Sequence, residues 1–159
     1  DSSSSELQGF ADADWARDRD DRKSTSGYLF LLSNASITWK SARQSGVALS
    51  TAEAEYVSLS LAGQECVWLR RIMQEMGENM EKPTIIHEDN LPAVHLMKNP
   101  KFHSRAKHID IRFHYTRGLV IQRDIEIVHC STNDMIADIL TKPLPKDQFI
   151  KLRKMCGVE

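Results

Sequence analysis

The chain has 159 residues with 41% hydrophobic and 27% charged side chains, and its formal net charge is −1. This length is typical of one domain that buries about 70% of its unfolded surface around a single core. No apolar run approaches the roughly 20 residues of a membrane span, so we expect no membrane partner.

The start, DSSSSE, predicts a flexible leader over residues 1–6, followed by one domain over residues 7–159. The three cysteines are widely spaced and form no CxxC pair, which is typical of a reducing compartment.

The first half of the chain predicts three strands and a long helix. LQGFADADW is a short extended run that ends in acids, and a polar turn region follows it. GYLFLLSN and ASITWKSA are rich in β-forming residues, which predicts an antiparallel hairpin or meander with the first strand. From Ser50 to about Met76 the apolar period is that of a helix, with Gly77 at the expected stop. Either Ser50 or Thr51 can cap this helix.

The second half predicts strands that alternate with helices. PTIIHED is typical of a short buried strand, LPAVHLMKN of a brief helix and AKHIDIRFHYTRGLVIQ of a longer one. DIEIVHC predicts a fifth strand, and helical pieces broken at Pro143 and Pro145 follow from Asn133 onward. This order predicts an α/β fold with one mixed sheet and helices packed on its faces.

Charge is unevenly distributed along the chain. Residues 98–123 carry seven lysines and arginines against one acid, Asp110, for a local charge of +6. A solvated helix face and a surface that binds a phosphate backbone both explain such a segment.

Two glutamates in LSTAEAEYVSL differ in their helical phase. At about 100° per residue, Glu53 and Glu55 point about 160° apart. Glu55 heads the apolar stripe, where a carboxylate is costly unless a partner such as a metal ion compensates its charge. Glu53 lies on the polar side and is expected to be a solvated acid of the first helical turn.

Other acids lie in places like the ends of strands, where the binding sites of α/β sheets are usually found. Asp12 closes the first predicted strand, Asp89 closes the fourth, and Asp138 lies in the last helical region. Converging carboxylates without cysteine favour Mg²⁺ or Mn²⁺, and such ions usually act on phosphates. We therefore expect two-metal phosphodiester hydrolysis. Strand alternation gives Asp14 the same face as Asp12, so the residues alone leave both open as the bridging ligand.

Seven motifs occur in one order from about Leu7 to Phe149: GFADADW, RKSTSGYLFLL, ITWKSARQ, LSTAEAEYVSL, EDN, KHIDIRFHYTR and ADILTKPL. Together they resemble the ribonuclease H domain of copia-type retrotransposon Pol polyproteins. The resemblance implies a ribonuclease H-like fold, with three antiparallel strands and then two parallel ones in a five-stranded mixed sheet flanked by helices. It also implies an acidic set that comprises Asp12, Glu55, Asp89 and Asp138.

The implied activity is that of an endoribonuclease, which hydrolyses the RNA strand of RNA–DNA hybrids during reverse transcription with two Mg²⁺ ions, for which Mn²⁺ can substitute. In this family context Asp12 is the preferred bridging ligand. The resemblance further implies the reverse transcriptase polymerase domain of the same polyprotein as a partner. It implies a cytoplasmic location within retrotransposon particles, with the nucleus as a second location.

Histidines provide two further hypotheses. Cellular relatives of the family place a histidine in a loop before the last helix, and His129 is the nearest candidate here, nine residues before Asp138. Copia-type sequences commonly lack it, so an incidental residue at a strand end is the other interpretation. His103, His108 and His114 are spaced by five and six residues, which suits one tetrahedral zinc site poorly and favours helix packing or phosphate contacts.

Recognition of a hybrid is expected to rest on shape, 2′-hydroxyls and phosphates. The candidate contacts are Ser24, Thr25, Thr51, Asn90, Arg105 and Lys107. Capping explains Thr51 equally well, turn formation explains Ser24 and Thr25, and solvation explains the cations. Trp39 and Trp68 are expected to belong to the core rather than to stacking platforms. Trp68 lies on the helix side away from Glu55 and is expected to cover the flank of the domain.

Two other function classes remain open. An integrase-like strand transferase shares this fold, but it needs a late glutamate on a C-terminal helix, whereas this chain has its glutamate second. A catalytically weak or silent module that only binds nucleic acid or polymerase can keep the same motifs. The presence of all four acids argues against such a loss.

Overall fold

The computed structural model describes residues 6–16, 20–98 and 107–158, with the side chains of residues 107–109 left out. The leader predicted over residues 1–6 therefore lies outside the described residues except for Glu6.

Five strands form one mixed sheet with the order β3-β2-β1-β4-β5. The strands are β1 (Leu7–Asp14), β2 (Thr25–Leu32), β3 (Ala35–Arg43), β4 (Thr84–Glu88) and β5 (Ile125–His129). β1, β2 and β3 pair antiparallel, whereas β4 pairs parallel with both β1 and β5. The predicted arrangement of three antiparallel and then two parallel strands is confirmed.

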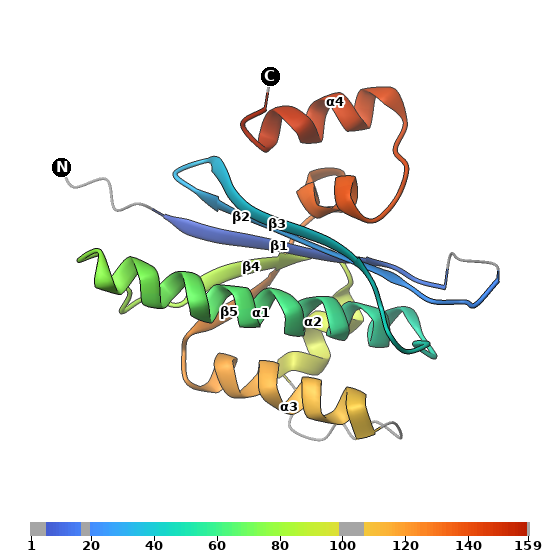
Figure 1. Ribbon diagram of the computed structural model, residues 1–159, viewed down its shortest axis with the longest axis horizontal. Coiled ribbons are helices and arrows are strands. Elements are labelled where there is room, and N and C mark those ends of the chain that lie inside the picture. The colour runs from blue at the N-terminus through green and yellow to red at the C-terminus, as the bar shows by residue number, and fades with distance from the viewer. Residues whose placement is uncertain (1–5, 17–19, 99–106, 159) are drawn as a thin grey trace.

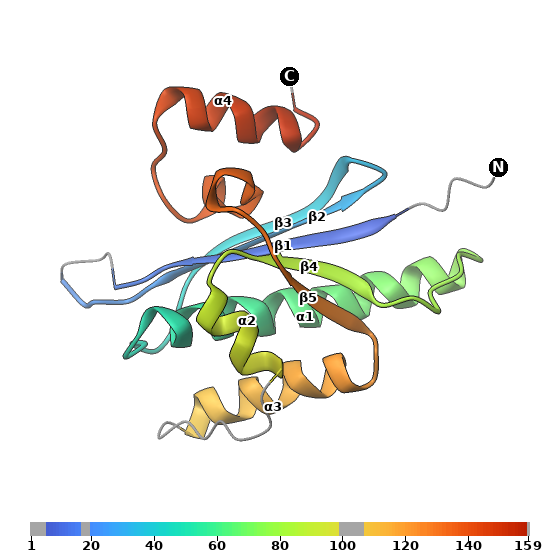
Figure 2. The same ribbon diagram turned by 180° about the vertical axis from the view of Figure 1, so that it is seen from behind.

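Helices cover both faces of this sheet (Figure 1). The α-helices are α1 (Thr51–Glu75), α2 (Leu91–Lys98), α3 (Lys107–Ile121) and α4 (Lys146–Met155). Two 3₁₀ turns, η1 (Thr132–Asp134) and η2 (Ile136–Leu140), follow β5. α1, α2 and α3 lie on one face, while η2 and α4 lie on the other, as the view from behind also shows (Figure 2). No helix in the described ranges is long and apolar enough to cross a bilayer.

The core has two layers, one on each face of the sheet. Phe30, Tyr56 and Phe113 are fully buried in the layer between the sheet and α1 and α3. Phe10 and Met135 belong to the layer under η2. Because both faces are covered, β1 and β2 are buried almost continuously, without the alternation of a half-exposed strand.

Local signals fix the ends of α1. Ser50 is the N-cap, and its hydroxyl accepts a hydrogen bond from the Glu53 N–H at 3.2 Å. The Glu53 carboxylate in turn accepts from the Leu49 N–H at 2.7 Å, so this acid supports the helix start. At the other end Gly77 has a φ of +89°, and the Glu78 N–H donates to the Met73 carbonyl, which closes the last turn.

Trp39 was expected in the core and is instead exposed, whereas Trp68 lies on the side of α1 away from Glu55, as its helical phase predicts. Trp39 is 61% exposed and lies on β3, an edge strand whose side chains are largely uncovered by helices. Trp68 is 55% exposed on the outward side of α1. The prediction for Trp39 was wrong because the strand pattern does not show how far the neighbouring layer extends.

Candidate active site

Three carboxylates from three elements converge at one end of the sheet. Asp12 lies on β1, Glu55 in the second turn of α1, and Asp89 directly after β4. One oxygen from each lies within 4.8 Å of the other two. β1 and β4 are parallel neighbours, so their carboxyl ends meet at the same edge.

Two polar side chains of α1, Ser58 and Glu65, hold the helix in the register that this convergence requires. The buried Ser58 hydroxyl, one turn after Glu55, donates to the carbonyls of Asp12 at 2.7 Å and Gly27 at 3.0 Å. Farther along the helix, Glu65 accepts hydrogen bonds from the hydroxyls of Tyr28 and Thr38. Glu55 is thereby held beside Asp12 with only 2% of its surface exposed.

Asp138 joins the cluster from the opposite face of the sheet, on η2. It is 2% exposed, and the Lys142 ammonium lies 2.8 Å from its Oδ1 and 3.7 Å from Oδ1 of Asp12. The Thr141 hydroxyl donates a short hydrogen bond to the other Asp12 oxygen. η2 can approach β2 this closely because residue 27 is glycine, whose missing Cβ would lie 2.7 Å from the Thr141 methyl carbon.

Burial and mutual repulsion raise the pKa values of Asp12, Glu55 and Asp138. Burial raises the pKa of Asp138 to about 6, with Lys142 opposing the rise. Burial also raises the pKa of Asp12, although Lys142 and Thr141 counteract part of the increase. Burial and then repulsion from Glu88 raise the pKa of Glu55 well above its usual range. The cluster therefore favours a binding partner that brings positive charge.

The donor set suits a hard divalent cation. All four acids offer oxygen only, which is the ligand chemistry of Mg²⁺ and Mn²⁺. In addition, Oε2 of Glu55 is buried and accepts no hydrogen bond from the described residues. A buried acceptor of this kind is costly unless a further group binds it, and a metal ion is such a group.

The sequence is similar to segments of transposon polyproteins. It is 42% identical to the retrovirus-related Pol polyprotein from transposon TNT 1-94 of Nicotiana tabacum over 152 residues, which is 96% of this chain and 11% of that protein. It is also 42% identical to the retrovirus-related Pol polyprotein from transposon RE1 of Arabidopsis thaliana, over 96% of this chain and 10% of that protein. The chain is a homologue of plant copia-type Pol polyproteins. It spans about a tenth of their length. No family model matches the sequence.

Solved ribonuclease H structures have the same fold as this Pol homologue. RNase H1 from Halobacterium salinarum superimposes with a TM-score of 0.60 at 14% identity, over 86% of this chain and 94% of that one. LC11-RNase H1 in complex with an RNA/DNA hybrid gives 0.63 at 14% identity, over the same shares. The foamy viral protease-reverse transcriptase in complex with a hybrid gives 0.63 at 16% identity, over 87% of this chain and 20% of that one. These likenesses show the ribonuclease H-like fold.

Asp14 and the histidines occupy less central places. Asp14 ends β1 and is half-buried. The group of three converging acids contains Asp12 and not Asp14. His129 is exposed at the end of β5 and pairs with Glu88 in the ladder between β4 and β5. His114 lies 3.4 Å from Asp110, one helical turn earlier. His103 and the side chain of His108 lie outside the described residues.

Of the candidate hybrid contacts, Ser24 and Asn90 have structural partners, and two others lie wholly or partly outside the described residues. Ser24 is fully buried and accepts a hydrogen bond from the Ala16 N–H, which is the turn-forming role. Asn90 caps α2 by accepting from the Ala93 N–H at 2.9 Å. Thr51 is exposed at the first position of α1, and Thr25 is half-buried at the start of β2. Arg105 and the side chain of Lys107 are not described. A role of these residues in hybrid binding stays a prediction.

Two residues that the sequence reasoning missed belong to the cluster's surroundings. Lys142 is one, and its signal was its place four residues after Asp138 in a helical region. Glu88 is the other: it is 0% exposed, and burial raises its pKa well above the usual range. Strand alternation from the buried Thr84 and Ile86 predicts the inward direction of Glu88.

Proposed function

We propose that this chain is a ribonuclease H that hydrolyses the RNA strand of RNA–DNA hybrids with divalent metal ions. The observation that carries the proposal is the convergence of Asp12, Glu55 and Asp89 within 4.8 Å, with Asp138 joined to them through Lys142. Homology to transposon Pol polyproteins and the ribonuclease H-like fold support the same activity.

The four acids would hold two Mg²⁺ ions, or Mn²⁺ in their place, with Asp12 as the shared ligand. Such ions, when bound, activate the attacking water and stabilise the leaving 3′ oxygen. The chain's own contribution is to fix the ligands. The Thr141 hydroxyl orients Asp12, Ser58 fastens the helix that carries Glu55, and the surrounding core keeps the carboxylates away from bulk water.

The alternative functions receive less support. A strand transferase of the integrase kind needs its glutamate late in the chain, whereas Glu55 is on α1 and the last acid of the cluster, Asp138, is on η2. A silent module has no need to keep four acids together, three of them buried, because their mutual repulsion destabilises the metal-free protein.

The cleavage assay with Asp89→Asn tests the proposal. The wild-type chain should cut the RNA of a labelled hybrid with Mg²⁺ or Mn²⁺ and should stop in EDTA. Asp89 is only half-buried, so Asp89→Asn should keep the fold while cleavage falls by about three orders of magnitude, because one carboxylate ligand is lost. Circular dichroism checks the fold, and cleavage at the wild-type rate would refute the metal assignment.

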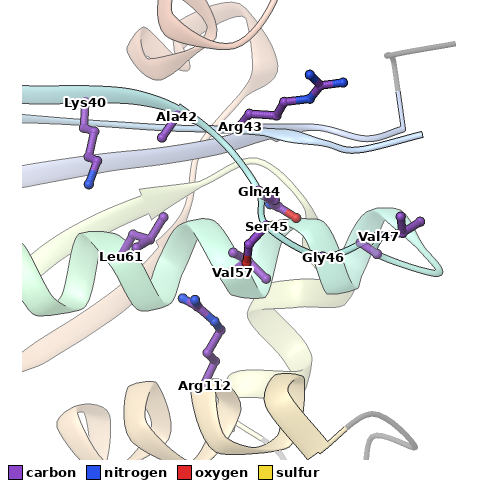
Figure 3. Close-up of a pocket in the computed structure, with 11 residues that line it drawn as sticks. Lys40, Ala42, Arg43, Gln44, Ser45, Gly46, Val47, Val57, Leu61 and Arg112 are labelled. Carbon is purple, nitrogen blue, oxygen red and sulfur yellow. The ribbon is translucent and has the colours of Figure 1, made fainter. Parts of the chain in front are cut away.

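A basic groove supplies a surface for the hybrid backbone. It lies between β3, α1 and α3, has a volume of about 400 Å³, and is lined by Lys40, Arg43 and Arg112 among other residues. Lys40 and Arg112 point toward α1 from opposite sides (Figure 3). Arg43 forms an ion pair with Asp21 at 2.6 Å. Two cations that face one hollow suit the phosphates of a nucleic acid backbone.

Removing these cations is expected to weaken hybrid binding without slowing the chemical step. Lys40→Ala and Arg112→Ala should each raise KM for the hybrid about five- to tenfold at low salt, with kcat nearly unchanged, because a phosphate contact is made equally in ground and transition states. The matched control is Lys154→Ala, which removes an exposed cation in the last turn of α4. An unchanged KM in both groove variants would contradict this role.

The polymerase domain as a partner and the particle location in the cytoplasm stay predictions, since this chain spans about a tenth of its relatives.

A further inference from the structure

A lysine ammonium stands inside the acidic cluster. Nζ of Lys142 lies 2.8 Å from Asp138 Oδ1 and 3.7 Å from Asp12 Oδ1, and its side chain is 27% exposed. It therefore bridges the two acids that β1 and η2 contribute. Within the described ranges, neither Glu55 nor Asp89 forms an ion pair.

The backbone fixes this lysine in place. The Lys142 N–H donates to the Asp138 carbonyl at 3.1 Å, and the neighbouring Thr141 binds Asp12 through its hydroxyl. The absence of a side chain at Gly27 lets this segment pack directly on β2. Lys142 is thus held at one end by the fold and at the other by two carboxylates, unlike a surface lysine free to change rotamer.

The position of Lys142 makes the charge of the cluster uneven, because the ammonium lies beside Asp138 and Asp12 and not beside Glu55 and Asp89. Asp12, Glu55 and Asp89 together carry enough negative charge and enough oxygens to hold one divalent ion. A second ion needs Asp138, whose charge Lys142 already neutralises at contact distance. Two cations at this distance repel, so one must leave before the other binds.

On the basis of the proposed function, we propose that Lys142 is a counter-ion that competes with the second metal ion for Asp12 and Asp138. In the substrate-free protein the first ion binds tightly, while the second binds weakly because it must displace the ammonium. Lys142 also keeps the acidic pair of β1 and η2 together before the second ion arrives, so it acts as a positioning residue.

Calorimetric titration with Mn²⁺ alone, at constant pH and without substrate, tests this competition. The wild-type chain should bind one Mn²⁺ tightly and a second at least about tenfold more weakly. Lys142→Met should tighten the second site by about tenfold or more and leave the first within about threefold. Lys142→Arg keeps the positive charge and should behave as wild type. Lys154→Met removes the same charge outside the cluster and should also leave both sites unchanged.

Thermal denaturation gives a readout that does not depend on activity. Lys142→Met should melt at a lower temperature than wild type in EDTA and should gain more from Mn²⁺, because an ion then replaces the missing ammonium. If the variant unfolds in EDTA, recovery of its fold by Mn²⁺ supports the inference, and failure to recover overturns it.

The outcomes separate this inference from the proposed function. A second-site affinity that Lys142→Met leaves unchanged overturns the competition and leaves the metal-dependent nuclease intact. Absence of Mn²⁺ binding in both proteins overturns both.

Discussion

Replacing Glu55 with glutamine is expected to lower hybrid cleavage by about three orders of magnitude or more, whereas Glu53→Gln should change it by less than about twofold. A thousandfold loss equals about 4 kcal/mol of transition-state stabilisation, which is the scale of a lost charged contact at a reacting centre. Glu55 is 2% exposed beside Asp12 and Asp89, while Glu53 accepts a hydrogen bond from the Leu49 N–H at the helix start.

The pair is a matched comparison, because both changes remove one carboxylate from the same helix two residues apart. Glutamine at position 53 keeps an oxygen that can accept from Leu49, so the helix start should survive. The measurement is the single-turnover rate with Mg²⁺, with circular dichroism as the check of folding. Equal losses in the two variants would mean that helical phase does not distinguish the metal ligand.

The metal-free protein should lose stability as the pH rises from about 4 to about 7, and Mg²⁺ should remove this loss. Burial raises the pKa of Asp138 to about 6 from the ordinary value of 3.8, and the pKa values of Asp12 and Glu55 are raised as well. A raised folded-state pKa means that the folded protein binds the proton more tightly than the unfolded chain. The resulting stabilisation is complete below the unfolded pKa and is lost as the pH passes the folded value.

The expected loss from Asp138 alone is on the order of 2–3 kcal/mol of unfolding free energy. Denaturant unfolding in EDTA at several pH values measures it, and the same series in saturating Mg²⁺ should be flat or rise with pH, because the metal binds the deprotonated ligands. Asp138→Asn is the control and should show a smaller loss in EDTA. A metal-free stability that increases across this window would contradict the assignment of raised pKa values.

The fold could be predicted because its signals are local. β-forming runs bounded by turn residues specify the strands, and a 25-residue helical period specifies α1. The same period separated Glu53 from Glu55, and the structure places the first in the helix start and the second among the acids. The sheet order then follows from the antiparallel start and the parallel crossovers.

The features that could not be predicted depend on contacts between segments that are distant in the sequence. Thr141 and Asp12 are 129 residues apart, and no periodicity shows that a hydroxyl and an ammonium from TKPL reach the first strand. The structural roles of Ser24 and Asn90 also arise from neighbours that motifs do not reveal. The exposed Trp39 shows the same limit, since residue type does not tell where the covering layer ends.

The dependence on η2 has a consequence for synthesis. While the ribosome still shields the segment after β5, the nascent chain has all five strands but lacks Asp138 and Lys142. Its three remaining acids then have neither the fourth ligand nor the ammonium that offsets their charge. The four-acid centre can therefore be completed only after η2 has been synthesised, and a chain that ends between β5 and η2 would lack both Asp138 and Lys142.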